Sequence, residues 1–157
     1  MKATNALLGG LAGASLLTLI HETTRQLVPN APRMDLLGEQ ALSKMLTRAD
    51  QPVPEEDTLY ALTMAGDIVS NALYYSMAGI GDAKTAPLKG TLLGLAAGIG
   101  AITLPRPLGL SEAPSKRTTE TAVMTVALYT LGGIAAGYAM QWLNLRKRLA
   151  PKESLVL

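Results

Sequence analysis

Residues 90–105 read GTLLGLAAGIGAITLP, an apolar stretch without a single charged side chain. Its glycines Gly90, Gly94 and Gly98 recur at every fourth position, so in a helix they would line one face. Extended to Pro87–Leu104, the stretch would rise about 27 Å as a helix, close to the ~30 Å hydrocarbon core of a bilayer. We therefore expect a membrane-spanning helix here.

Three further apolar blocks accompany this one, at Asn5–Ile20, Thr58–Ile80 and Thr121–Leu143. Soluble helices of such length carry a charged stripe on the solvent side, but these blocks hold only Asp67 in their interiors. A soluble bundle is thus the weaker interpretation. The first block ends in bulky and charged residues (TLIHETTRQ), which argues against cleavage as a signal peptide. The prediction is an all-α integral membrane protein, a four-helix bundle.

An internal repeat relates the first and third blocks. With an offset of 85 residues, Ala6–Ile20 aligns with Thr91–Pro105, and seven of the fifteen pairs are identical. Chance similarity between two Gly/Ala/Leu-rich helices is the alternative. Duplication of a two-helix hairpin predicts two parallel repeats related by an axis along the membrane normal. The chain then forms a single membrane domain over 1–157, with a first repeat at 1–81, a second at 86–145 and a basic tail at 146–157.

The first repeat carries an insertion at about 26–54. Met34, Leu37 and Ala41 recur there at helical spacing, and Asp35 can cap the start of the helix. This pattern predicts an amphipathic helix that lies on the membrane surface or covers the end of the bundle.

Small residues at four-residue spacing predict how the helices associate, because lipid tails are as apolar as leucine and helices in a bilayer pair by close backbone packing. The GxxxG motifs, extended to a glycine zipper in the third block, comprise Gly9, Gly13, Gly90, Gly94, Gly98, Gly133 and Gly137. We expect at least one of these faces to pack between subunits of an oligomer.

Asp67 is the exceptional residue of the second block. It shares a helical stripe with Tyr60, Asn71 and Tyr74, and the four are candidates for contact with an ion or a partner. A carboxylate near the bilayer midplane costs at least ~2.5 kcal/mol, so it should face the protein interior, a cavity or a partner. Three states stay open: a neutral group bonded to a neighbouring helix, an ionised group in a hydrated cavity, and a group paired with a base of another protein.

Several functional classes lack support in the sequence. The chain has no cysteine and a single histidine, which leaves no thiolate site and a poor metal site. We therefore expect no metal, no cofactor and, since no catalytic set is recognisable, no enzyme. A basic face with aromatic platforms is also missing, so nucleic acid is not an expected partner.

Orientation rests on the basic residues near the ends of the blocks. Lys and Arg divide seven to seven between the two sides, so the positive-inside rule returns a tie. Trp142, Arg146, Lys147 and Arg148 form the densest interfacial anchor, which favours both termini in the cytoplasm, in a bacterial inner membrane.

Two functions follow from these patterns. The first is a structural or accessory membrane subunit that packs through its small-residue faces into a homo-oligomer or a larger complex, with the lipid bilayer, itself or other membrane subunits as partners. The alternative is a small homo-oligomeric proton or cation channel or carrier that uses Asp67. Exposure of the Asp67 stripe to water would favour the alternative.

Overall fold

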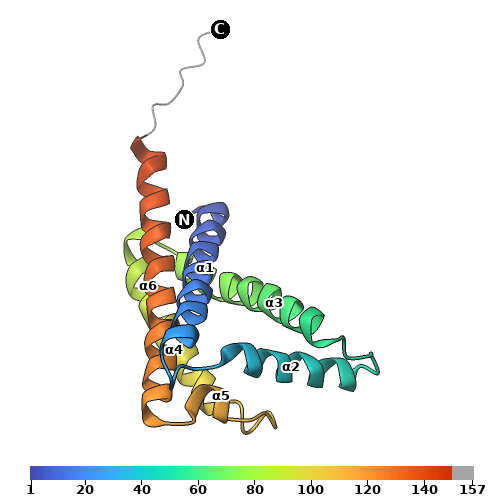
Figure 1. Cartoon of the computed structure of the whole chain (residues 1–157). Coiled ribbons are helices and arrows are strands. Elements are labelled where there is room, and N and C mark those ends of the chain that lie inside the picture. The colour runs from blue at the N-terminus through green and yellow to red at the C-terminus, as the bar shows by residue number, and fades with distance from the viewer. Residues whose placement is uncertain (150–157) are drawn as a thin grey trace.

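The computed structural model describes the backbone of residues 1–149 and the side chains of residues 1–146, and over this range the chain is helical without strands. The all-α prediction is confirmed, and each of the four apolar blocks forms a helix. The helices, shown in Figure 1, are α1 (Ala3–Leu27), α2 (Met34–Arg48), α3 (Glu56–Ser76), α4 (Ala86–Thr103), α5 (Ala113–Lys116) and α6 (Thr119–Leu149). Two short 3-10 turns, η1 (Met77–Gly79) and η2 (Ala83–Thr85), connect α3 to α4.

Three segments are long and apolar enough to cross a membrane: Ala3–Leu27, Ala83–Thr103 and Thr119–Arg146. They contain α1, α4 and most of α6. Helix α3 is not among them, and it carries Glu56, Asp57 and Asp67. The protein is therefore a helical chain with several potential membrane spans, whereas the predicted bundle of four spans is not confirmed.

The three potential spans run alongside one another, with α6 packed against both α4 and α1 (Figure 1). Helix α3 packs against α1 but leaves the other helices obliquely, and α2 runs outward beneath α3. Both α2 and α5 are at the end opposite the chain's N-terminus. This arrangement leaves few contacts between α3 and α4.

The predicted two-fold repeat is not confirmed by this packing. An axis that exchanges α1 with α4 and α3 with α6 would also exchange the α1–α6 contact with the α3–α4 contact. Helix α1 packs along α6 extensively, whereas α3 barely touches α4. The oblique course of α3 is the reason for the difference.

Glycines lie where α4 meets α6. A Cβ added at Gly94 would be 2.5 Å from the carbonyl oxygen of Tyr129, and one added at Gly98 would be 2.6 Å from the Cα of Val126. Gly90 and Gly133 face each other across the same interface, and Gly137 faces Ala86 and Pro87 of α4. The two backbones therefore approach too closely for any side chain to stand between them at these points.

Glycines of α1 are divided between two neighbours. Gly9 and Gly13 pack against α6 at Met140 and Ala136, while Gly10 packs against the backbone of α3 at Ala72. The small-residue positions predicted from the sequence thus lie against helices of the same chain.

A compact apolar core fills the space around α6. Leu17, Tyr75, Ala136 and Met140 are fully buried there. The hydroxyl of Tyr75 donates a hydrogen bond of 2.8 Å to the carbonyl oxygen of Tyr129, which links α3 to α6. Such a bond satisfies the polar end of an otherwise apolar side chain.

The insertion and the C-terminal segment depart in detail from the expectations. Helix α2 begins at Met34, and the predicted cap at Asp35 is wrong, because this carboxylate lies in the first turn and accepts hydrogen bonds from Arg33 and Arg25. Helix α6 continues to Leu149, so the predicted tail begins as helix.

The predicted interfacial anchor lies near the end of α6. Trp142 is 52% exposed, and the Arg146 guanidinium lies 4.0 Å from the centre of its ring. The side chains of Lys147 and Arg148, and residues 150–157 of the predicted basic tail, lie outside the described residues.

Candidate functional site

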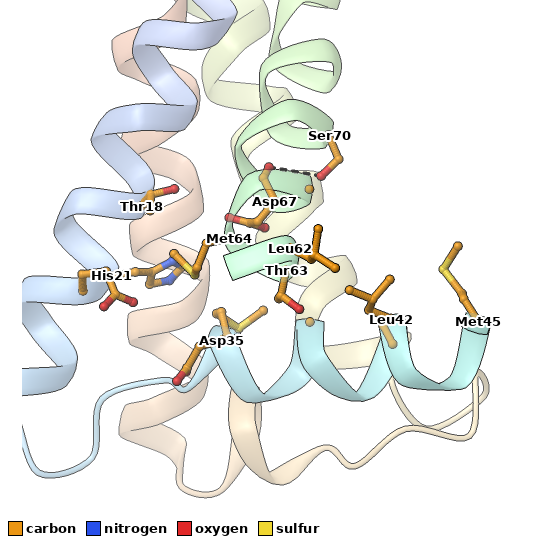
Figure 2. Close-up of a pocket in the computed structure, with 15 residues that line it drawn as sticks. Thr18, His21, Asp35, Leu42, Met45, Leu62, Thr63, Met64, Asp67 and Ser70 are labelled. Atoms are coloured by element: carbon orange, nitrogen blue, oxygen red, sulfur yellow. Dashed lines mark hydrogen bonds between the residues drawn. The ribbon is translucent and has the colours of Figure 1, made fainter. Parts of the chain in front are cut away.

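Asp67 borders a cavity of about 280 Å³ enclosed by α1, α2 and α3, which we call the polar cavity (Figure 2). Its carboxylate is half-buried, and the Asn71 side-chain amide donates a hydrogen bond of 2.9 Å to Oδ1. Among residues 1–146, no lysine, arginine or histidine lies within ion-pair distance of this carboxylate. Asp67 is thus an acid that faces open space without a basic partner in the described chain.

Three other side chains bring buried polar atoms to the polar cavity. The Oγ1 atoms of Thr18 and Thr63 and the Nε2 atom of His21 are buried, and none has a hydrogen-bond partner in the structure. Figure 2 shows Thr18 and His21 on α1, opposite Thr63 and Asp67 on α3. These atoms have almost no accessible surface, and a buried polar atom left unpaired costs about 1–3 kcal/mol.

A network of charged and polar groups ties the three helices together next to the polar cavity. Arg25 on α1 pairs with Glu22 at 2.6 Å and with Asp35 of α2 at 3.1 Å. Arg33 pairs with Asp35 at 2.7 Å, and the Tyr60 hydroxyl on α3 donates to Glu22 at 3.2 Å. The network therefore holds α2 and the beginning of α3 against the end of α1.

Asp35 is the centre of this network. It is only 7% exposed, and although burial raises its pKa, the hydrogen bonds from Arg33 and the charges of Arg33 and Arg25 bring the pKa below the ordinary value. The hydrogen bond to Asp35 in turn raises the pKa of Arg33. Burial, followed by the charge of Asp35, raises the pKa of Glu39. Asp35 is thus held as a carboxylate, as its two arginine partners require.

On the other side of Asp67, a groove of about 600 Å³ separates α3 from α4, and we call it the α3–α4 groove. Asp67, Asn71 and Tyr74 lie along its α3 wall. The α4 wall consists of small residues together with one leucine: Ala96, Ala97, Gly100, Ala101 and Leu104. Asp67 and Ser70 border both the groove and the polar cavity.

The structure separates the four predicted stripe residues into two groups. Asp67, Asn71 and Tyr74 border the same groove, and the Tyr74 hydroxyl bridges to α4 by donating to the Leu93 carbonyl oxygen at 3.1 Å. Tyr60 lies about 10 Å further along α3 and belongs to the Glu22–Arg25 network.

Sequence reasoning missed the contribution of α1 to the site. Thr18, His21, Glu22 and Arg25 occur at three- and four-residue spacing, so they share a face at the end of an otherwise apolar helix. That polar face was the available signal. The contribution of α2 carried no such signal, because its position beneath α3 depends on the tertiary structure.

The donor set does not resemble a divalent-metal site. Within the described residues, no group of three or more His, Asp or Glu side chains is placed to hold a metal ion. What the site offers is the Asp67 carboxylate with a neighbouring amide, several buried hydroxyls and an imidazole, while its other two carboxylates, Glu22 and Asp35, are paired with arginines.

Comparison of the chain with protein-family models, with curated proteins and with solved structures finds no match. The functional argument therefore depends on the geometry of Asp67 and its two cavities.

Proposed function

We propose that the protein is a small membrane carrier or channel for protons or a monovalent cation, with Asp67 as the anionic group of its binding site. The observation that carries this proposal is the position of Asp67 between two cavities, with no basic side chain of the described chain paired to it. A carboxylate within or beside the hydrocarbon layer is expensive and is by default a sign of function.

The surroundings of Asp67 support an exchangeable ligand. Thr18, His21 and Thr63 present buried polar atoms that the protein itself leaves unpaired. These atoms have almost no accessible surface, so water or an ion in the polar cavity would satisfy them once the side chains turn toward it. The polar cavity and the α3–α4 groove meet at Asp67, which gives a ligand two possible directions of approach.

The alternative of a purely structural or accessory subunit receives less support from the same geometry. A structural subunit of that kind would need small-residue helix faces that are free to pack against another subunit. Gly94 and Gly98 lie against α6, and Gly9 and Gly13 lie against a neighbouring face of the same helix, so these faces are covered within the chain.

The test is transport by the purified full-length protein in lipid vesicles under an imposed membrane potential. We would measure proton flux with a pH-sensitive dye trapped inside and uptake of radiolabelled tetramethylammonium. Asp67→Asn keeps the side-chain shape and removes the charge, so we expect the fold to remain and the flux to fall to the level of protein-free vesicles.

Ser70→Ala is the matched control. Ser70 borders the same two cavities, but its hydroxyl donates to the backbone oxygen of Asp67, as Figure 2 shows, and supplies no charge. This variant should retain flux. Equal flux in the parent and in Asp67→Asn would contradict the proposal and favour a structural role for Asp67.

A further inference from the structure

We propose that the α3–α4 groove binds a lipophilic organic ammonium ion, with the charged head at Asp67 and the apolar part along α4. This inference rests on the proposed function and names the class of cation that the same site would take.

The charge of the groove defines the charge of its ligand. Among the residues that line it, Asp67 is the only acid and none is basic. The Asn71 amide occupies Oδ1 of Asp67, and no described residue donates a hydrogen bond to Oδ2. One carboxylate oxygen is therefore available to one positive charge.

The chemistry of the walls argues against a divalent inorganic cation. Calcium takes six to eight oxygen ligands and magnesium near-octahedral coordination, which one carboxylate and one amide do not supply. Tyr129 also lines the groove, and aromatic rings attract ammonium groups.

Most of the groove is apolar, which requires a ligand with an apolar part. Its α4 wall presents Ala96, Ala97, Gly100 and Ala101, whose short side chains leave room between the helices. The volume of about 600 Å³ falls within the range of roughly 300–1,000 Å³ typical of sites for small organic molecules. The polar cavity on the other side of α3 is smaller, about 280 Å³, and is lined by more acidic groups.

The groove follows from the way the helices pack. Helix α3 diverges from α4, and the two helices are bridged by the hydrogen bond from Tyr74 to Leu93. Tyr74 lies about 10 Å along α3 from Asp67, so this bridge stands at one end of the apolar wall and leaves the wall itself open.

The test compares two ligands with the same head group. Full-length protein in lipid nanodiscs would be titrated with tetramethylammonium and with hexyltrimethylammonium, and partition into protein-free nanodiscs would be subtracted. Each methylene that enters the groove should tighten Kd by about fourfold, the factor for a buried CH₂ of about 0.8 kcal/mol. Asp67→Asn should abolish binding of both ligands.

Gly100→Leu fills the groove without touching the carboxylate. A Cβ at Gly100 meets only a Leu104 side-chain atom at 3.4 Å, so the variant should fold. We expect hexyltrimethylammonium binding to weaken to the level of tetramethylammonium, with binding of the smaller ion unchanged. Gly66→Leu is the matched control, because it adds the same bulk on the side of the polar cavity, where a Cβ meets nothing within 4 Å.

The outcomes separate this inference from the proposed function. If Gly100→Leu still binds hexyltrimethylammonium more tightly than tetramethylammonium, the apolar part of the ligand does not lie in the groove, and only this inference is overturned. Proton flux that depends on Asp67, without binding of either ammonium ion by the parent, would also overturn the inference and leave the proposed function intact. Conversion of a dimer to a monomer by Gly100→Leu would assign the groove to a second copy of the chain. If Asp67→Asn retains both flux and ammonium binding, both proposals are refuted.

Discussion

Replacement of Gly94 by alanine is the most direct test of the close contact between α4 and α6. The added Cβ would lie 2.5 Å from the carbonyl oxygen of Tyr129 and 2.8 Å from the Cα of Thr130. Both are backbone atoms, so no side-chain rotation can relieve the overlap. Ordinary contact begins at 3.4 Å, and the two helices would therefore have to separate by about 1 Å.

The expected loss follows from this separation. Overpacking of a tight contact costs about 1–3 kcal/mol, and attraction between the facing atoms falls steeply with a gap of that size. Alanine in place of glycine within a helix stabilises the folded state by roughly 0.5–1 kcal/mol, which offsets part of this loss. We expect Gly94→Ala to lower the free energy of unfolding by up to about 2 kcal/mol after these effects are combined.

The assay is unfolding by SDS in mixed micelles, followed by far-ultraviolet circular dichroism. Gly66→Ala is the control, since a Cβ at Gly66 meets nothing within 4 Å and the substitution also replaces a helical glycine by alanine. It should leave stability unchanged or raise it by up to about 1 kcal/mol. If Gly94→Ala unfolds at the same SDS concentration as Gly66→Ala, the close approach of α4 and α6 at Gly94 is incorrect.

Two further predictions concern single polar groups. Tyr75→Phe removes the hydroxyl that donates to the Tyr129 carbonyl oxygen within the fully buried core. It should lower the free energy of unfolding by about 1 kcal/mol in the same SDS assay. An unchanged midpoint would show that this hydrogen bond contributes nothing to stability. The Asp35 pKa is lowered in the folded protein, so its contribution to stability is present above its ordinary value of 3.8 and is lost as the pH falls through the lowered pKa. The protection factors of the α2 amides, which compare their exchange with that of an unfolded peptide at the same pH, should therefore fall below about pH 4. Asp35→Asn, which gives up charged bonds to Arg25 and Arg33, should lower them already at pH 7. Exchange that is equally slow in Asp35→Asn would contradict the role of the network.

The sequence alone was sufficient to locate the long helices, but not the short helix α5. Charge-free apolar runs such as GTLLGLAAGIGAITLP are long enough to cross a bilayer, and backbone groups in that setting must bond within the helix. This local rule predicted the blocks that became α1, α4 and α6. It also predicted a helix over most of α3, which is not among the potential spans.

The sequence also identified Asp67 as the unusual residue, because an uncompensated acid stands out against an apolar background. Its partners were harder to predict. Asn71 and Tyr74 follow from helical spacing, since they lie on the same face one or two turns away. Thr63, four residues before Asp67, follows from the same spacing. His21 approaches Asp67 from α1 around a cavity that α2 closes, and periodicity along one helix contains no information about that convergence.

Only the tertiary structure decided the direction of each helix relative to its neighbours. Four-residue spacing placed Gly94 and Gly98 on one face, but it did not specify that α6 would occupy that face. The oblique course of α3 separated it from α4, moved Tyr60 into the network with Arg25, and opened the groove beside Asp67. Helix directions depend on which faces pack together across the whole chain, and the free energy of that packing is a sum over contacts between residues distant in sequence.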